Sequence, residues 1–169
     1  MQYVGNPADE IVTGLWLGNG VAARDEAFLK EKGIRAVFNC TKDIPFRDLK
    51  LNNYRLPVDD NLQDEEIRNM SLWSFEVVYK LCTEHKKGPV LVHCFAGMQR
   101  SAAVVAMYLI SVTDTKWEKV KEYIQSKRPI AFRPSANFEK AIREFETTFD
   151  KEIRPRIVNT QTPSNTHQD

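Results

Sequence analysis

The chain has 169 residues, of which 42% are hydrophobic and 28% are charged. This balance is typical of a soluble globular protein, and the length suits one domain, because two smaller pieces would each bury little apolar surface. The 24 Lys and Arg residues nearly cancel the 23 Asp and Glu residues, so the net charge of +1 predicts no general attraction to nucleic acid or to an anionic membrane. No apolar run approaches the roughly 20 residues of a membrane-spanning helix.

The N-terminal sequence MQYVGNPADE lacks the basic and apolar regions of a secretion signal. Three cysteines, Cys40, Cys82 and Cys94, form an odd and sparse set that does not suit a disulfide framework. These features predict reduced thiols and a cytoplasmic or nuclear location. No pattern in the sequence indicates an oligomeric state.

The first half of the chain predicts strands and one helix. Residues 11–18 predict a strand or hairpin with Gly14 at a turn, and a helix is expected to follow and to end at Gly33. Residues 34–40 and 53–58 predict two further strands. One face of the predicted helix consists of Val21, Ala22, Phe28 and Leu29.

A long helix is predicted next, from about Asp64 to His85. Its broad apolar face consists of Ile67, Met70, Leu72, Trp73, Phe75, Val78 and Leu81. Residues 89–94 predict a strand that carries Cys94 at its C-terminal end. Residues 101–112 are apolar nearly all round, which predicts a buried central helix.

Two amphipathic helices are expected after the central helix. The first covers 116–128, is capped by Thr115 or Asp114, and directs these side chains inward: Trp117, Val120, Tyr123 and Ile124. Ser135 or Asn137 is expected to open the second, over 137–149.

The composition turns polar after about Asp150. We therefore expect a domain over residues 1–150 and a polar tail over 151–169 that is weakly structured or packed only through Ile157 and Val158.

The order of these elements predicts an α/β fold with a central, mostly parallel sheet of about four to five strands flanked by helices. Ligand sites in such sheets lie beyond the carboxyl ends of the strands. Cys94 is expected at that edge of the sheet.

The segment HCFAGMQRS, residues 93–101, links the strand to the central helix. Such a loop can curl so that its N–H groups point inward, and Gly97 permits a backbone conformation that a side chain would hinder. The inward amides and the positive end of the helix make an anion site, to which Arg100 adds a planar fork that matches two phosphate oxygens. The expected phosphate-binding residues are Phe95, Ala96, Gly97, Met98, Gln99 and Arg100.

The same positive field acts on the thiol of Cys94. A free cysteine has a pKa near ~8.5, and helix N-termini or nearby cations lower it. The resulting thiolate is a nucleophile, so the predicted loop both binds a phosphate and activates its attacker. Ser101 can donate a hydrogen bond to this thiolate, and His93 is expected to orient the loop through backbone contacts.

HCFAGMQRS matches the HCxxGxxR[ST] signature of the protein tyrosine phosphatase superfamily, and its HCxAGxxRS form resembles the dual-specificity branch. Residues 15–41 resemble the opening strand–helix–strand of that branch, and residues 128–146 resemble its closing helix. The resemblance extends over roughly residues 8–148. It implies a protein tyrosine phosphatase-like fold and a phosphatase with a phosphocysteine intermediate that uses no metal or organic cofactor.

Two other interpretations of Cys94 are open. It could be a buried small apolar residue, the usual fate of a free cysteine. It could also join Cys82, His85 and His93 as a zinc ligand. Against zinc, neighbouring residues in a strand such as His93 and Cys94 point to opposite faces.

The leaving oxygen of a phosphate ester needs a proton, which a carboxylic acid on a loop above the anion site can supply. The segment LPVDDNLQDEE, residues 56–66, combines a strand end with such acids. The resembling family uses the aspartate of a P-[IV]-x-D turn, which implies Asp60, with Asp59 as the alternative. Asp64 and the neighbouring glutamates are expected to charge the first turn of the long helix.

Several residues have a supporting role or a structural one. Asn137 resembles the family's asparagine that hydrogen-bonds the phosphate loop, although it could merely cap the last helix. Arg133 could hold a second anion or be a solvated surface residue. Cys40 could be a core thiol or form a regulatory disulfide with Cys94. A solvated helix face is expected from the basic residues Lys116, Lys119, Lys121, Lys127 and Arg128.

The loop contains no lysine, whereas family members that act on inositol phospholipids usually carry lysines there. Family members that act on RNA 5′ ends typically have threonine after the arginine, where this chain has Ser101. The resemblance therefore implies a phosphorylated protein as substrate, with phosphotyrosine and phosphoserine or phosphothreonine. The alternatives are an RNA 5′-triphosphatase or phosphoinositide phosphatase, and a phosphoprotein-binding module without turnover.

Overall fold

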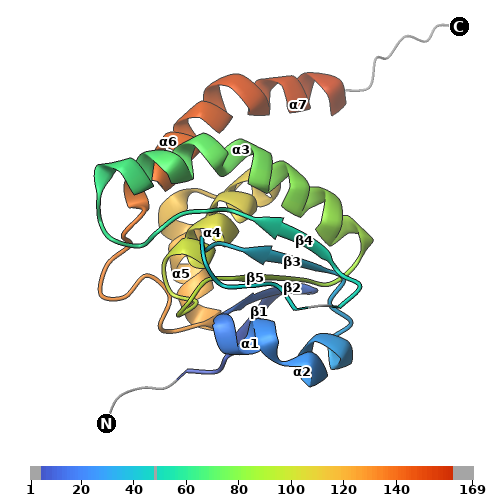
Figure 1. The fold of residues 1–169 in the computed structure, drawn as a ribbon. Coiled ribbons are helices and arrows are strands. Elements are labelled where there is room, and N and C mark those ends of the chain that lie inside the picture. Colours follow the sequence, from blue (N-terminus) through green and yellow to red (C-terminus); the bar gives the residue numbers. More distant parts are fainter. Residues whose placement is uncertain (1–4, 48, 162–169) are drawn as a thin grey trace, which may run out of the picture.

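The structure is a computed structural model that describes residues 5–47 and 49–161 (Figure 1). Its centre is a five-stranded sheet with the strand order β1-β2-β5-β3-β4. Only the β1–β2 pair is antiparallel, so the predicted α/β fold with a mostly parallel sheet is confirmed. The strands are β1 Ala8–Val12, β2 Leu15–Gly18, β3 Ala36–Asn39, β4 Asn52–Arg55 and β5 Val90–His93.

Strand β5 lies in the middle of the sheet, parallel to both of its neighbours. In the register, His93 pairs with Gly18 of β2 and with Asn39 of β3. The carboxyl ends of three strands therefore meet at one edge. Cys94, the residue after β5, begins the loop at the centre of that edge.

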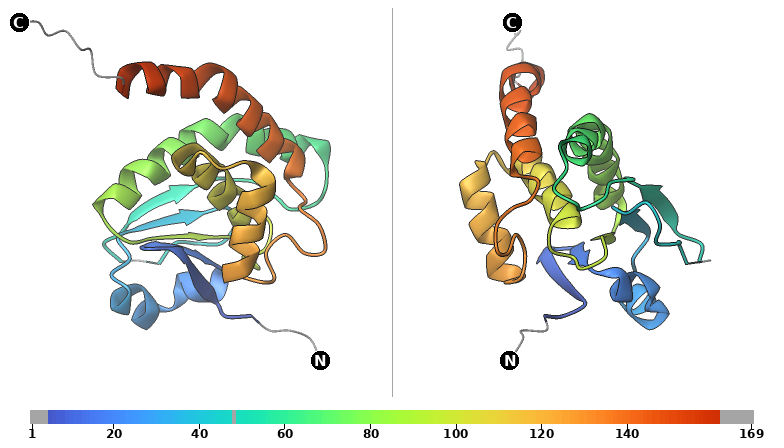
Figure 2. Two further views of the ribbon diagram at one scale, coloured as in Figure 1. Left: turned by 180° about the vertical axis from the view of Figure 1, so that it is seen from behind. Right: turned by 60° about the vertical axis from the view of Figure 1, so that its left-hand side comes forward.

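Helices cover both faces of the sheet (Figure 2). One face carries α3 Asp64–Lys87, α4 Arg100–Thr113, α5 Trp117–Lys127 and α6 Glu139–Thr148, and the other carries α1 Gly20–Arg24 and α2 Glu26–Glu31. Side chains of β5 alternate between the two sides: Val90 and Val92 belong to the large core, and Leu91 belongs to the small core under α1 and α2. Burial on both faces explains why β5 is a continuous apolar run.

The predicted single helix before Gly33 is divided in two. Asp25 lies between α1 and α2, and its carboxylate accepts a hydrogen bond from the Phe28 N–H at 3.1 Å. An aspartate that caps a second helix start interrupts the first helix. Val21, expected on the buried face, is consequently 56% exposed.

Helix α3 follows the predicted range, but its apolar face is narrower than expected. Met70, Val78 and Leu81 are buried, whereas Leu72 is 75% exposed and Trp73 is also exposed. Helices α4 and α6 pack against one side of α3 only, so an apolar face that extends further round the helix remains outside the core.

The expected caps of the last helices are wrong. Asp114 ends α4 in the left-handed conformation, with φ 56°, and α5 begins after Lys116. The Trp117 N–H is instead satisfied from another helix, because it donates to Glu146 Oε2 at 2.7 Å. Helix α6 begins after Phe138, beyond both predicted opening residues.

The chain continues as a helix after α6. A π-helical segment, η1 Phe149–Ile153, leads into α7 Arg154–Gln161. Of the two alternatives for the tail, a weakly structured one is wrong as far as Gln161, and Ile157 is 38% exposed. Residues 162–169 and the side chain of Val158 lie outside the description. Within the described residues, no helix combines the length and apolar character needed to cross a lipid bilayer.

Candidate active site

The loop between β5 and α4 folds back on its own cysteine. The Gly97 N–H donates a hydrogen bond to Cys94 Sγ at 3.3 Å, and Ser101 Oγ lies 3.1 Å from the same sulfur. Cys94 is buried, yet it lines a hollow of about 360 Å³ together with residues of its loop. The walls of this hollow are Asp60, Cys94, Phe95, Ala96, Met98, Gln99, Arg100, Arg133 and Asn137.

Gly97 is required by the shape of the loop. Its φ of +68° lies in the left-handed region, where a side chain is strained. A Cβ at this position would also lie 2.6 Å from the carbonyl oxygen of Gly18 and 2.7 Å from a guanidinium nitrogen of Arg128. The glycine therefore lets the loop pack directly on the end of β2.

The surroundings of Cys94 favour its thiolate. Burial raises the pKa of the Cys94 thiol, but hydrogen bonds from Ser101, the positive charge of Arg100 and the Gly97 N–H outweigh it, so the pKa lies below the usual cysteine value. The thiolate, not the thiol, is the nucleophile, so a lowered pKa makes the reactive form more abundant near neutral pH, and it also makes the sulfur a better leaving group.

Arg100 is the first residue of α4, and its side chain forms one hydrogen bond within the described part of the chain. Its Nη1 donates to the Val58 carbonyl at 2.9 Å, which ties the loop after β4 to the site. Its Nε is buried, and among the described residues it has no hydrogen-bond partner. A buried donor without a partner is costly, so this edge of the guanidinium is suited to an anion above Cys94.

Asp60 is the acid that the structure places at the hollow of Cys94. Its Oδ1 accepts a hydrogen bond from Asn137 Nδ2 at 2.9 Å. Asp59, the alternative acid, is instead 3.2 Å from Lys42 and does not line this hollow. Lys42 also pairs with the buried Glu66 at 2.7 Å, so Asp59 belongs to a charged cluster at the start of α3.

Gln99 connects the phosphate loop to the turn before α6. Its Nε2 donates to the carbonyls of Arg133 at 3.1 Å and Ser135 at 2.8 Å, and its Oε1 accepts from the Asn137 N–H at 2.9 Å. Asn137 thus contacts the loop through its main chain, while its side chain reaches Asp60. Arg133 is exposed at the rim of the same hollow.

Arg128 contradicts its expected place on a solvated helix face, because it is 1% exposed. Its Nε donates to the Gly97 carbonyl at 2.8 Å, and Nη2 donates to the Ala96 carbonyl at 3.3 Å. Nη1 forms an ion pair with Asp9 at 2.8 Å. By holding these carbonyls on the outer side of the loop, Arg128 favours N–H groups that point inward.

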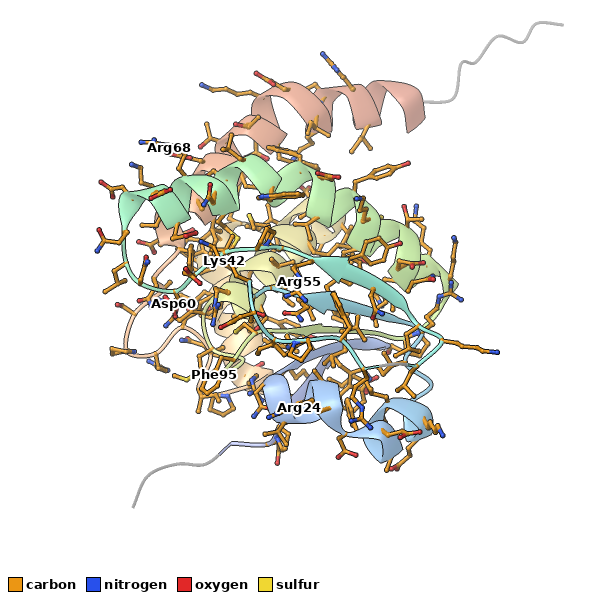
Figure 3. All side chains as sticks on the ribbon, viewed as in Figure 1. Arg24, Lys42, Arg55, Asp60, Arg68 and Phe95 are labelled. Carbon is orange, nitrogen blue, oxygen red and sulfur yellow. The ribbon has the colours of Figure 1, made fainter. Side chains whose placement is uncertain are left out.

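The remaining loop residues have distinct environments. His93 Nδ1–H donates to the Cys94 carbonyl at 3.3 Å, and burial lowers the pKa of this histidine to about 4, so it is neutral at pH 7. The Met98 carbonyl accepts from the Phe132 N–H at 2.8 Å. Phe95 is 75% exposed at the mouth of the site, where Figure 3 shows it on the same side of the sheet as Asp60.

Among the described residues, Cys40 and His85 form no hydrogen bond with the sulfur of Cys94. Cys40 lies beside Cys94, since its N–H donates to the His93 carbonyl at 2.8 Å, but all three cysteines are free thiols. Burial raises the pKa of Cys40, as does the neighbouring Cys94. His85, from the alternative zinc set, contacts Tyr108 and the Thr13 carbonyl, and no group of three metal-ligating side chains occurs among the described residues.

Comparison with known proteins agrees with this geometry. The family model of the dual specificity phosphatase catalytic domain matches residues 15–148, so the chain belongs to that family. Mouse dual specificity protein phosphatase 15 is 28% identical over 154 residues, which cover 91% of this chain and 64% of that protein. The chain therefore spans less than two thirds of the length of this relative.

Solved structures share the fold. A crystal structure of DUSP15 has a TM-score of 0.76 and 28% identity, and the match covers 92% of this chain and 97% of that one. Human DUSP28, at 23% identity, has a TM-score of 0.77 with 89% and 99% covered, which shows similarity of fold alone.

Proposed function

We propose that this chain is a protein phosphatase that hydrolyses phosphotyrosine, and also phosphoserine and phosphothreonine, through a phosphocysteine intermediate on Cys94. The observation that carries the proposal is the pair of contacts at the sulfur, 3.3 Å from the Gly97 N–H and 3.1 Å from Ser101 Oγ. Both donate to the thiolate at the centre of the sheet edge. The neighbouring guanidinium of Arg100 has a buried edge that suits the phosphoryl group.

The first step forms a bond between Cys94 Sγ and phosphorus. The ester bond breaks, and the carboxylic acid of Asp60 donates its proton to the departing oxygen of the substrate. The positive field of Arg100 and the loop amides stabilises the negative charge on the phosphoryl oxygens. The products of this step are the free alcohol, the Asp60 carboxylate and a phosphorylated cysteine.

The second step restores the enzyme. The Asp60 carboxylate accepts a proton from water, whose oxygen bonds to phosphorus as the sulfur–phosphorus bond breaks. Ser101 donates a hydrogen bond to the departing thiolate, which lowers the cost of its negative charge. Inorganic phosphate leaves, and the residues named here complete the cycle without a further reactant.

A phosphorylated protein is the substrate class that the loop supports best. Apart from Arg100, the phosphate loop carries no cationic side chain, because its other residues are Phe95, Ala96, Gly97, Met98 and Gln99. A polyphosphate group of RNA or an inositol lipid would bring several charges to a loop that carries one guanidinium.

Steady-state release of phosphate from four substrates tests this proposal. A phosphotyrosine peptide and a phosphothreonine peptide should be hydrolysed faster than RNA 5′-triphosphate or a phosphoinositide. Cys94→Ser should abolish turnover, whereas Cys82→Ser, on α3, should leave it intact. A wild-type protein that binds phosphopeptides without releasing phosphate would instead favour a binding module, and a preference for the RNA or lipid would overturn the substrate class.

A further inference from the structure

A second and larger hollow, of about 900 Å³, adjoins the hollow of Cys94. The two share Asp60, Phe95, Ala96 and Arg100 as walls. The larger one extends from this rim over the start of α1 and the loop after β3. A polypeptide that places a phosphorylated side chain above Cys94 can therefore continue into this groove without leaving the protein surface.

The rim of the groove is apolar and exposed. Phe95 is 75% exposed and Val21 is 56% exposed. Contact with water does not stabilise such apolar side chains, so their surface is available to pack against a bound molecule. The Gly20 N–H donates to the Phe95 carbonyl at 3.1 Å, which fixes the start of α1 beside the phosphate loop. Ile44, Pro45 and Ile130 add further apolar surface to the groove.

Among the residues that the structure describes, the groove has one cation, Arg24, that neither forms an ion pair nor belongs to the catalytic loop. Its charged walls are Arg24, Asp43, Asp59, Asp60, Arg100 and Arg128. Asp59 pairs with Lys42, and Arg128 pairs with Asp9. Arg24 donates only to the Gly20 carbonyl through Nε, at 3.2 Å, among the described residues.

Arg24 and Val21 lie one helical turn apart on α1, so they face the groove together. Figure 3 shows Arg24 on the side of the molecule where Phe95 also lies. Asp43, on the loop after β3, has no ion-pair partner among the described residues and would repel an anion placed near it. These positions favour an acidic group on the α1 side of the groove.

The walls are held in place before any substrate binds. Arg55 donates to the Thr41 carbonyl and to the Ile44 carbonyl, each at 2.9 Å, and Asn39 Nδ2 donates to the Ile44 carbonyl at 2.7 Å. On the other side, Asn19 Oδ1 caps α1 by accepting from the Val21 and Ala22 N–H groups. A groove with fixed walls loses little conformational entropy when a peptide binds.

We propose that this groove binds the polypeptide segment that flanks the phosphorylated residue of the substrate. In this segment an apolar side chain packs on Phe95 and Val21, and an acidic side chain pairs with Arg24. The inference rests on the proposed function and narrows its substrate class to phosphoproteins with apolar and acidic residues beside the phosphorylated one.

The test compares kcat/KM for p-nitrophenyl phosphate with kcat/KM for two phosphotyrosine peptides. The residues beside the phosphotyrosine are acidic and apolar in the first (the acidic peptide) and basic in the second (the basic peptide). The small aryl phosphate reaches the phosphate loop but not the groove. Arg24→Glu should lower kcat/KM for the acidic peptide by roughly 3- to 10-fold and raise it for the basic peptide, because reversing an exposed charge removes one weak pair and adds a repulsion. Turnover of p-nitrophenyl phosphate should stay within about twofold.

Two further variants complete the experiment. Val21→Asn should raise KM severalfold for the peptide with acidic and apolar flanks. The effect of Arg24→Glu on the choice between acidic and basic flanks should stay the same. Arg68→Glu, an exposed arginine of α3 outside the groove, is the matched control and should change nothing. The groove proposal is overturned if Arg24→Glu alters all peptides equally, or if it weakens hydrolysis of a soluble inositol bisphosphate but not of the acidic peptide. Failure of the wild type on every substrate would instead reject the proposed function.

Discussion

Cys94 experiences two opposing influences. Burial disfavours the charged form of its thiol, whereas Ser101, Arg100 and the Gly97 N–H favour it and prevail, so the pKa is lowered. Ser101 Oγ lies 3.1 Å from the sulfur, closer than the Gly97 nitrogen at 3.3 Å. Since the thiolate must be regenerated in each cycle, this hydroxyl should act in both the activation of the sulfur and its release.

Ser101→Ala is expected to raise the pKa of Cys94. Because a raised pKa moves the protonated thiol to higher pH, alkylation by iodoacetamide at mildly acidic pH should slow roughly tenfold, the effect of losing about 1.4 kcal/mol of hydrogen bonding to a charged group. The pH dependence of the alkylation rate measures this change. Ser111→Ala, on the same helix, should keep the wild-type profile.

Asp60 is held by one side chain from a distant part of the sequence. Asn137 Nδ2 donates to its Oδ1 at 2.9 Å, and the Asn137 main chain is itself fixed by Gln99. An exposed aspartate on a loop would otherwise occupy several rotamers. In the proposed mechanism, this contact aims the acid at the leaving oxygen, and we propose Asn137 as a positioning residue.

Asn137→Ala should lower kcat for phenyl phosphate, a poor leaving group, by roughly 10-fold, because the acid is less often in place. For p-nitrophenyl phosphate, which departs with little protonation, the loss should be small, and KM should change little for both esters. Asp60→Asn should show the same pattern more strongly. Ser135→Ala, in the same turn, is the control. Equal losses for the two esters in Asn137→Ala would contradict a role through Asp60.

At the scale of elements, the end of α5 supports the phosphate loop. Arg128 follows the helix in an extended conformation, which turns its side chain from the helix surface towards the loop carbonyls. Removal of the Arg128 guanidinium would leave Asp9, a half-buried carboxylate, without a cationic partner. It would also remove the hydrogen bonds that hold the loop carbonyls, so the loop could change shape.

Arg128→Met should reduce the free energy of unfolding by about 3–5 kcal/mol, the usual cost of leaving one partner of a buried ion pair alone. Urea denaturation followed by the fluorescence of the three tryptophans measures it. Lys127→Met removes the exposed cation next to it and should cost less than about 1 kcal/mol. Similar midpoints for both variants would show that the pair contributes little.

The central elements could be predicted because their parts are contiguous in the sequence. Strand β5, the loop and α4 occupy one run of residues, so the apolar strand, the glycine and the arginine could be interpreted together. Arg128 could not, because it follows a helix rich in exposed cations and its direction depends on backbone angles after the helix ends. The arginine–proline pair at 128–129 is the only local sequence pattern that indicates that Arg128 lies beyond the end of the helix.

Contacts between residues that are far apart in the sequence could not be predicted either. Asn137 and Asp60 are 77 residues apart, and their meeting depends on how the turn before α6 lies on Gln99. Leu72 is exposed against the prediction for a similar reason, since α4 and α6, rather than α3 itself, set the width of the covered face of α3.

At the scale of the whole molecule, His93 makes stability depend on pH. Its pKa is about 4 in the folded protein against an ordinary value of 6.5. Between these values the unfolded chain binds a proton that the folded protein excludes, so stability is complete above pH 6.5 and falls as the pH falls towards 4. From pH 7 to 5 the loss from this residue alone should be about 2 kcal/mol.

Urea denaturation at pH 7 and at pH 5 tests this contribution. His93→Gln, whatever its stability at pH 7, should lose about 2 kcal/mol less than the wild type between these two pH values. The same dependence in both proteins would place the acid sensitivity elsewhere.

The ion pair between Arg128 and Asp9 connects β1 to the shape of the phosphate loop, although β1 lies away from the sulfur. Arg128 also donates to the Asn6 carbonyl at 2.6 Å, so three segments meet on one guanidinium: the start of the chain, the end of α5 and the phosphate loop. A protease that trimmed the chain just beyond Asp9 would remove no residue that touches the sulfur. It would nevertheless release the arginine that shapes the catalytic turn, and inactivation would follow from cleavage at the margin of the domain.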